Sequence, residues 1–344
     1  MEHVRELFDV PPGYLNTASI GVPPREALDA FAAATADWGA GRAQPPDYDP
    51  FVDEARAVFA RLVGVDARDV AVGTQVSTFT SMVAASVEPG SEVLVYEDDF
   101  SSVLFPLMVV RDRGVRVRTV PSMRELAGAI DARTSLVAFS AVQSADGEVA
   151  ELAAIAAAAE AHGALTYVDA TQAVGWLPLD ASRFDLVAVA AYKWLLSPRG
   201  AAFMTVRRER LAGVRPIAAG WYAGEDRWGS LYGRELPLAT DARRLDVSPA
   251  WLSWVAAVPA LRLLARVGID AIHAHDLALA NRFRVGLGLE PSNSAIVATT
   301  VPGAAERLPA AGVMAASRAG AFRLAFHLYN TEADVDLALE ALGA

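Results

Sequence analysis

The stretches "LTYVDATQAVGW" (165–176) and "LVAVAAYKWLLSPRG" (186–200) decide the fold. Each starts with a run of apolar residues, and each run ends at a single charged side chain, Asp169 in the first and Lys193 in the second. Short, nearly continuous apolar runs rich in β-branched residues are typical of strands buried on both faces. We therefore expect a lone carboxylate and a lone ammonium at the tips of two buried strands.

Similar patterns continue on both sides of these two runs. Apolar runs typical of strands are "DVAVGT" (69–74), "EVLVYED" (92–98), "SLVAFSAV" (135–142) and "AAFMTV" (201–206). Helical patterns lie between several of them, at 77–87 and 149–163. Strands that alternate with helices predict an α/β fold with a mostly parallel sheet, covered by helices on both faces.

The pattern changes in the last third of the chain. A long helical stretch at 249–268 leads to "FRLAFHLYNTEADVDLALEALG" (322–343), which reads as a strand, a turn and a helix with Thr331 as its N-cap. We predict a large α/β domain at 14–240 and a smaller α+β domain at 241–344, with residues 1–13 packed nearby.

Composition narrows the classes of protein. The 344 residues are 53% hydrophobic and 21% charged, which suits a folded globular protein. The net charge of −11 and the absence of a basic patch argue against nucleic-acid binding. No apolar run has membrane-spanning length, and the N-terminus lacks a signal-peptide core, so we expect a cytoplasmic protein. The chain has no cysteine, and its histidines lack ligand spacing, so we expect no metal site.

Polar side chains follow several of the predicted strands. Ligands bind at the carboxyl ends of the strands in open parallel sheets. Thr74, Asp98, Phe100 and Gln143 would lie at this edge together with Asp169 and Lys193. Asp169 and Lys193 alone would be explained by a salt bridge, but the convergence of so many polar strand ends favours a binding site.

An ordered set of motifs resembles one enzyme family. "DATQAVG", followed 24 residues after its Asp by "YKWLLSPRG", resembles the cofactor motif of class V aminotransferases, which are fold type I enzymes that use pyridoxal phosphate (PLP). "YLNTASIG" (14–21), "GTQVSTF" (73–79), "FSSVLFP" (100–106) and "SRAGAFRLAFHLYNT" (317–331) follow in the family's order. The Tyr-Lys and Phe-Ser-Ser motifs resemble those of kynureninase more than those of the cysteine desulfurases. The resemblance covers nearly the whole chain and implies the fold type I architecture.

The resemblance implies how PLP would be held. Lys193 would form the Schiff base with PLP, and Asp169 would pair with the pyridine nitrogen. Gln172 would hydrogen-bond the 3-oxygen of the ring. Thr74 and Gln75, at the start of the helix that follows a predicted strand, would bind the phosphate, Thr74 also through its hydroxyl. A helix N-cap remains an alternative role for Asp169, and a simple capped helix start remains one for 73–79.

Further contacts follow from the same resemblance. The hydroxyl of Tyr192 would reach the phosphate, and Phe100 would stack on the ring, although a lone phenylalanine is more often a core residue. Family members build each site from two subunits, so a homodimer is implied. Trp221 and Ser248 would then contact the cofactor across the dimer, and the sequence leaves open whether they act within one chain instead.

The substrate would be a small-molecule amino acid. Arg323 matches the family's arginine for the α-carboxylate, which a planar guanidinium meets with two parallel hydrogen bonds. A surface salt bridge is the alternative. The same pocket would be framed by Asn16, Ser19, Gln143 and Asn330.

The reaction type is the least determined property. All reactions of such a site start from an external aldimine between PLP and an α-amino acid. We expect an aminotransferase; a lyase of kynureninase or C–S lyase type and an epimerase remain alternatives, and a non-catalytic PLP-binding regulator is a weaker one. Because a persulfide-forming desulfurase uses a thiol nucleophile, the lack of cysteine argues against that activity.

Overall fold

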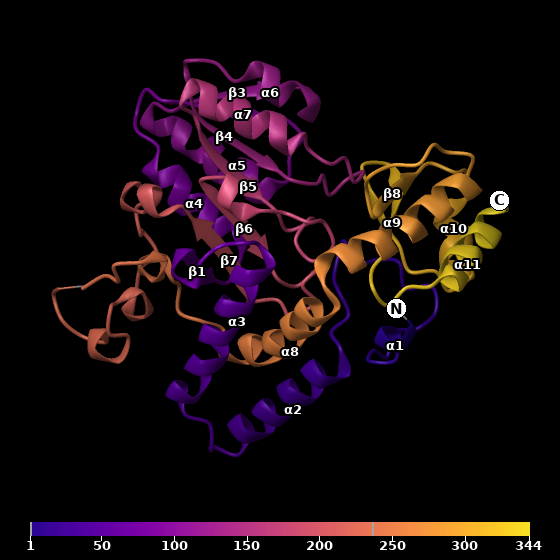
Figure 1. The fold of residues 1–344 in the computed structure, drawn as a ribbon, viewed down its shortest axis with the longest axis horizontal. Coiled ribbons are helices and arrows are strands. Elements are labelled where there is room, and N and C mark those ends of the chain that lie inside the picture. Colours follow the sequence, from indigo (N-terminus) through magenta and orange to yellow (C-terminus); the bar gives the residue numbers. More distant parts are fainter. Residues whose placement is uncertain (1, 236) are drawn as a thin grey trace.

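A seven-stranded sheet forms the centre of the protein, described here by a computed structural model that covers residues 2–235 and 237–344 (Figure 1). Its strand order is β1-β7-β6-β5-β4-β2-β3, and β7 alone among them runs antiparallel to its neighbours. The strands are β1 (Val70–Gly73), β2 (Glu92–Tyr96), β3 (Arg116–Val120), β4 (Thr134–Ser140), β5 (Leu165–Asp169), β6 (Leu186–Ala190) and β7 (Ala202–Val206).

Helices cover both faces of this sheet. One face packs against α4 (Val76–Ser86) and α5 (Ser101–Val109). The other packs against α3 (Asp49–Leu62), α6 (Leu126–Ala129) and α7 (Leu152–His162). Successive residues of a strand enter opposite layers, so Val168 and Tyr167 of β5 lie in different hydrophobic clusters. The structure confirms the predicted α/β fold with a mostly parallel sheet between helical layers.

A second, smaller sheet lies in the C-terminal part of the chain. It has the antiparallel order β8-β10-β9, with β8 (Ile296–Thr299), β9 (Ala316–Arg318) and β10 (Ala321–Ala325). Its helices are α9 (Ile269–Gly286), α10 (Ala304–Ala310) and α11 (Glu332–Leu342). Thr331 is the N-cap of α11, as predicted, and its N–H donates a 2.8 Å hydrogen bond to Asp334 Oδ2.

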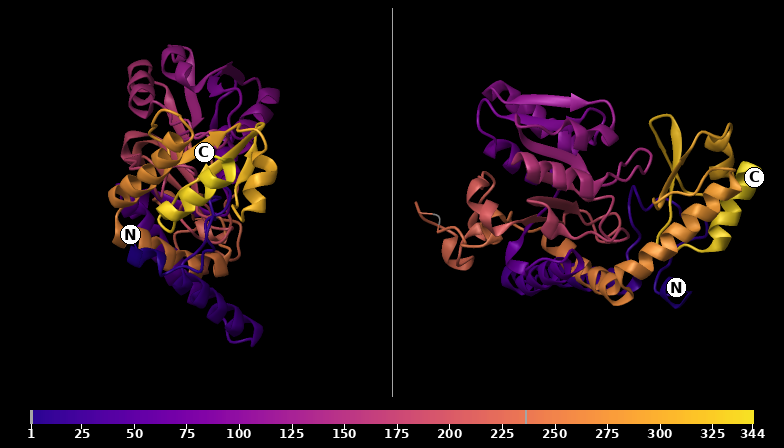
Figure 2. Two further views of the ribbon diagram at one scale, coloured as in Figure 1. Left: turned by 90° about the vertical axis from the view of Figure 1, so that its right-hand side faces the viewer. Right: turned by 45° about the horizontal axis from the view of Figure 1, so that its top comes forward.

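The N-terminal segment connects the two sheets. After α1 (Glu2–Arg5), Asn16 pairs with Ala325 of β10, and the N–H of Gly21 donates to the carbonyl of Tyr192 at 2.9 Å. Helix α8 (Trp251–Val267) packs against α2 (Arg25–Gly39) and α3, and continues towards the small sheet as α9 (Figures 1 and 2). The domain boundary at residue 240 stays a prediction.

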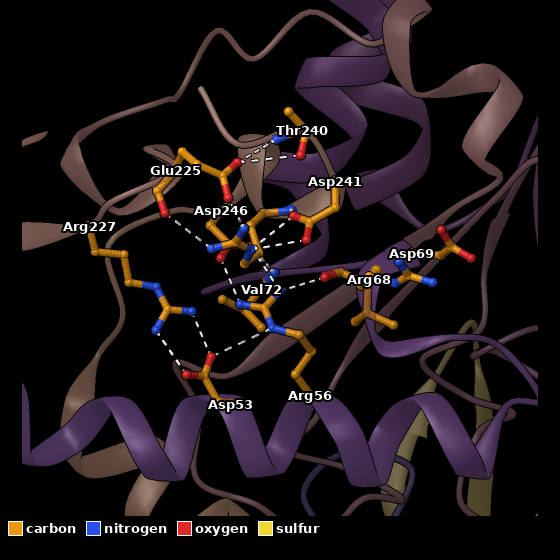
Figure 3. A network of polar contacts seen from close by, with 12 residues as sticks. Asp53, Arg56, Arg68, Asp69, Val72, Glu225, Arg227, Thr240, Asp241 and Asp246 are labelled. Atoms are coloured by element: carbon orange, nitrogen blue, oxygen red, sulfur yellow. Dashed lines mark hydrogen bonds and ion pairs between the residues drawn. The ribbon is translucent and has the colours of Figure 1, made fainter. Parts of the chain in front are cut away.

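A buried ion pair fixes the loop that precedes α8. Arg56 of α3 contacts Asp246 at 2.7 Å, and Asp246 also accepts a 2.8 Å hydrogen bond from the N–H of Val72 in β1 (Figure 3). The N–H of Val247 then donates to the carbonyl of Val72 at 2.9 Å. These contacts hold the backbone before Ser248 against the edge of the large sheet.

Strand β3 was absent from the sequence-based prediction. It lies at the end of the sheet, and most of its side chains are partly or fully exposed. Arg116 and Arg118 interrupt its apolar pattern, and both contact Glu92 on the neighbouring strand. An edge strand of this kind carries charges where a central strand carries apolar residues.

None of the helices within the described ranges combines the length and apolarity needed to cross a membrane.

Candidate active site

A pocket opens at the carboxyl ends of the parallel strands. It lies where β1, β4, β5 and β6 end, which is the edge at which the sequence predicts a site. The residues that line it are Gln75, Val76, Ser77, Phe100, Ser102, Ser140, Val142, Ser144, Asp169, Thr171, Gln172, Ala190, Tyr192, Lys193 and Arg199.

Lys193 and Asp169 both reach this pocket from adjacent strands. Asp169 is the last residue of β5 and pairs with Ala188 of β6, and Lys193 follows three residues after the end of β6. Both side chains are buried. Lys193 is also the only lysine among the 344 residues, a signal that the sequence analysis did not use.

Burial sets the protonation of the two groups. It lowers the pKa of Lys193 to about 8, with Asp169 acting in the opposite direction. It raises the pKa of Asp169, against hydrogen bonding from Thr171 and the charge of Lys193. Lys193 therefore has an appreciable fraction of neutral amine near neutral pH, which an ordinary lysine lacks.

The carboxylate of Asp169 lies at the wall of the pocket. Oδ1 accepts a 2.9 Å hydrogen bond from the N–H of Thr171, in a turn like that of a helix cap. Hydrogen bonding from the Thr171 side chain also stabilises the carboxylate, and Asp169 lines the pocket. A carboxylate at the wall of a pocket suits a cationic N–H of a ligand.

The start of α4 supplies backbone donors. Gln75 is its N-cap, and its side chain makes no capping hydrogen bond. The N–H groups of Val76 and Ser77, in the first turn, have no intrahelical acceptor and line the pocket. Such a helix start attracts an anion. Thr74 lies just before this turn and is absent from the pocket lining.

Two aromatic residues flank the lysine. Lys193 Nζ lies 5.3 Å from the centre of the Phe100 ring and 5.7 Å from that of Tyr192. Phe100 is 41% exposed, so it is a pocket residue and not part of the core. The guanidinium of Arg199 lies 5.0 Å from the centre of the Tyr192 ring.

Two predicted glutamines have different surroundings. Gln172 lines the pocket, donates from Nε2 to the carbonyl of Ala18 at 2.9 Å and accepts at Oε1 from Trp194 Nε1 at 2.7 Å. Gln143 is buried and donates from Nε2 to Asp99 Oδ1 at 2.9 Å. Gln172 is thus held at the pocket, whereas the amide of Gln143 is committed to Asp99.

Arg323 lies on β10 and is almost fully buried. Its Nη2 donates to Ser19 Oγ at 2.7 Å, and its Nη1 donates to the carbonyl of Ser144, a pocket residue. Burial lowers its pKa to about 10, and the charge of Arg318 acts in the same direction. Within the described part of the chain, no carboxylate lies within ion-pair distance of Arg323, and its Nε has no partner.

The remaining predicted residues lie at varying distances from this centre. The Asn16 side chain has a buried Oδ1 without a hydrogen-bond partner in the described chain. Asn330 donates to the carbonyl of Tyr14 at 2.8 Å and supports the N-terminal segment. Trp221 packs against Trp228, with ring centres 4.9 Å apart, and Ser248 is exposed. Neither residue lines the pocket of its own chain.

Sequence reasoning missed Arg199, which lines the pocket, and Asp99, which supports the strand ends beside it. Asp99 accepts hydrogen bonds from the N–H groups of Phe100 and Ser140 and from Gln143, so it fixes the ends of β2 and β4. Asp99 lies directly before Phe100, and nothing in the acidic run "EDDF" indicates that this residue, rather than its neighbours, is buried. Arg199 lies in "SPRG", soon after the lysine, where its charge could have drawn attention.

The residues present fit PLP. The Asp169 carboxylate at the pocket wall suits the pyridine nitrogen, the first turn of α4 suits the phosphate, and Lys193 supplies the amine. A large parallel sheet with these groups at its carboxyl edge and a smaller C-terminal sheet beside it is typical of a PLP-dependent enzyme of fold type I.

Comparisons with known proteins agree with this site. The family model "Aminotransferase class-V" matches residues 49–302. An uncharacterized aminotransferase of Bacillus subtilis, YcbU, is 31% identical over 313 residues, covering 84% of this chain and 82% of the relative. Isopenicillin N epimerase of Streptomyces clavuligerus is 29% identical over 392 residues, covering 99% and 96%.

Solved structures share the fold. A mutant of the cystine C–S lyase C-DES, with glycine covalently linked to its PLP cofactor, has a TM-score of 0.87 at 21% identity and covers 98% of both chains. Kynureninase and cysteine desulfurases are also among the relatives. The chain belongs to the class V aminotransferase family of PLP-dependent enzymes.

Proposed function

We propose that this enzyme is an aminotransferase that uses PLP and acts on an α-amino acid. The observation that carries the proposal is Arg323, a buried guanidinium beside the lysine pocket that lacks a carboxylate partner within the described residues. Burying an unpaired charge costs free energy unless a ligand compensates it. An α-carboxylate has the charge and the planar shape to do so.

The remaining residues have separate roles in the proposal. When bound, PLP supplies an electron sink for the bond that breaks at the substrate's Cα. The Lys193 amine binds the cofactor and moves a proton to and from Cα, because its lowered pKa suits both directions of transfer. Asp169 keeps a proton on the pyridine nitrogen, and Gln172 donates to the ring oxygen. Gln75 and Thr74, with the hydroxyl of Tyr192, bind the phosphate.

Substrate contacts beyond Arg323 come from the N-terminal segment. Ser19 fixes Nη2 of Arg323, and Asn16 offers a buried oxygen that has no partner in the described chain. Gln143 would contribute through the part of its amide that does not donate to Asp99. The proposed enzyme is a homodimer whose two chains share their active sites, with Trp221 and Ser248 contacting the partner's cofactor.

A lyase is the second candidate. The aromatic pair Tyr192 and Phe100 around Lys193 favours it, because both motifs resemble kynureninase. An epimerase reaction would use the same groups, and one relative is an isopenicillin N epimerase. A persulfide-forming desulfurase remains disfavoured because the chain has no cysteine, although desulfurases are among its relatives. A non-catalytic PLP-binding regulator is the least supported.

The test is to incubate the PLP-loaded enzyme with a panel of L- and D-amino acids, with and without 2-oxo acids. Consumption of the amino acid that requires a 2-oxo acid supports the aminotransferase. Release of ammonia, pyruvate or alanine without a 2-oxo acid contradicts it in favour of a lyase. Inversion of the configuration at Cα, without a 2-oxo acid and without release of these products, supports an epimerase. Lys193→Ala is the matched control and should be inactive in every arm.

A further inference from the structure

His327 and Asp276 form a fully buried pair beside the segment that carries Lys193. His327 follows β10 and Asp276 lies on α9, and both have 0% of their surface exposed. His327 Nδ1 lies 2.9 Å from Asp276 Oδ2, and Nε2 lies 3.1 Å from the carbonyl oxygen of Trp194. The chemistry proposed above uses neither side chain.

The hydrogen-bond geometry assigns the protons of this pair. The carbonyl of Trp194 can only accept, so Nε2 of His327 carries a hydrogen and donates it. Burial lowers the pKa of His327 to about 3 and raises the pKa of Asp276. Full burial of both side chains disfavours a charged pair, so we infer a neutral imidazole that accepts at Nδ1 from a protonated Asp276. Asp276 Oδ1 has no partner in the described chain, which costs less for a carboxylic acid than for a carboxylate.

The Trp194 carbonyl that His327 contacts has little freedom. A Cβ atom on Gly175 would lie 2.4 Å from this oxygen, so the turn after β5 presses on it from another side. The carbonyl of Lys193 is equally confined, since a Cβ on Gly21 would lie 2.0 Å from it. The backbone carbonyls of Lys193 and Trp194 are thus confined by the two glycines, and His327 adds a hydrogen bond to the carbonyl of Trp194.

The contact extends into the cofactor pocket through Trp194. Its indole packs edge-on against the imidazole of His327, with ring centres 5.1 Å apart, and donates to Gln172 Oε1 at 2.7 Å. Gln172 lines the pocket. Hydrogen bonds to the backbone carbonyl and to the indole of Trp194 therefore connect α9 of the C-terminal part, through this one residue, to the edge of the cofactor site.

We propose that His327 is a positioning residue for the cofactor pocket and that a protonated Asp276 fixes its tautomer. His327 holds the Trp194 backbone, and Trp194 in turn holds the Gln172 amide at the ring site. The role rests on the proposed function, because Gln172 and Lys193 are the residues proposed to hold the cofactor ring. Neither His327 nor Asp276 would touch PLP.

The first test measures PLP binding to His327→Phe, which keeps an aromatic ring and removes the donor. We expect PLP affinity about tenfold weaker, the order of one lost buried hydrogen bond, and a shifted absorption maximum of the bound cofactor. His275→Gln is the matched control: His275 lies next to Asp276, contacts the carbonyl of Asn330 at 3.1 Å and should leave both readouts unchanged. Wild-type affinity and spectrum in His327→Phe would overturn the proposal.

The second test compares two substitutions of Asp276. Asp276→Asn still offers an N–H to Nδ1 of His327, so we expect PLP affinity within about twofold of the wild type. Asp276→Ala leaves Nδ1 unpaired and should weaken binding as His327→Phe does. If Asp276→Asn binds PLP as weakly as Asp276→Ala, the carboxyl is not the donor and the tautomer assignment falls.

A third measurement needs no variant. In ¹⁵N NMR spectra of the wild-type enzyme at neutral pH, His327 should show one protonated nitrogen, Nε2, and one unprotonated nitrogen, Nδ1. A doubly protonated ring would mean a charged pair and would contradict the inference even if every variant failed to fold. Attachment of PLP to Lys193 is tested separately on the wild type, so failure of the proposed function is distinguishable from failure of this role.

Discussion

Arg323 Nη2 and Ser19 Oγ lie 2.7 Å apart, although 304 residues separate them in the sequence. The contact joins β10 of the small sheet to the N-terminal segment, and the other end of the guanidinium contacts the carbonyl of Ser144 at the pocket. The arginine is therefore held in place from two sides before any substrate binds. Pre-ordered groups of this kind lose little entropy on binding.

Replacing Arg323 should weaken substrate binding and leave cofactor binding intact. Arg323→Gln removes the charge without adding a second amine near PLP, so we expect the Kd of the amino acid to rise about 10- to 100-fold. The spectral titration of the PLP-loaded enzyme with amino acid measures this. Arg266→Gln on α8 is the control, because that arginine is exposed. An unchanged Kd in Arg323→Gln would show that the carboxylate is bound elsewhere.

The charge of Asp169 should matter more than its shape. Asp169→Asn keeps the volume and removes the carboxylate that would hold the proton on the pyridine nitrogen. We expect kcat to fall by at least about 100-fold, the order found for loss of one preorganised electrostatic partner. Asp98→Asn is the control: this carboxylate is exposed, so its replacement should leave kcat unchanged. A near wild-type kcat in Asp169→Asn would remove the residue from the mechanism.

The lowered pKa of Lys193 predicts how cofactor attachment depends on pH. Only the neutral amine attacks PLP, and a pKa of about 8 makes the neutral form dominant above that pH. The attachment rate to the cofactor-free protein should rise about tenfold per pH unit up to about 8 and then level off. Stopped-flow absorbance measures it. A rate that keeps rising to about pH 10 would mean that burial does not shift this lysine.

The α/β fold and the positions of Asp169 and Lys193 could be predicted from the sequence for physical reasons. Asp169 and Lys193 end long apolar runs, and the edge of a parallel sheet brings such strand ends together. The roles assigned to Arg323, Tyr192 and Phe100 came from the family resemblance, which periodicity alone does not supply.

Contacts between distant segments could not be predicted in the same way. Trp194 and His327 are 133 residues apart, and neither residue type signals the other. Asp99 looks like one of three surface acids in "YEDDF" until the fold buries it between β2 and β4. Strand β3 lacks an apolar run because most of its side chains are exposed or only partly buried at the end of the sheet.

Mixing two damaged chains should test whether the site is shared. Ser248→Ala should weaken PLP binding, and Lys193→Ala should abolish covalent attachment. If Ser248 acts across a dimer, the mixed dimer pairs an intact lysine with the Ser248 of the Lys193→Ala chain and regains one wild-type site. We expect each mixed dimer to attach PLP with wild-type affinity at one site, which is about half the number of such sites in a wild-type dimer. Absorbance titration measures this. Mixtures that behave as the sum of the two variants would place Ser248 in its own chain's site or outside any site.

The most direct test of the central claim is where PLP is attached. The enzyme is loaded with PLP, reduced with borohydride, digested and mapped by mass spectrometry. Because Lys193 is the only lysine in the chain, the competing amine is the one at the N-terminus. We expect the reduced cofactor on the peptide that contains Lys193, in a ratio close to one per chain, and none in Lys193→Ala. Cofactor at the N-terminal amine, or no fixed cofactor at all, would contradict the assignment of this pocket as the PLP site.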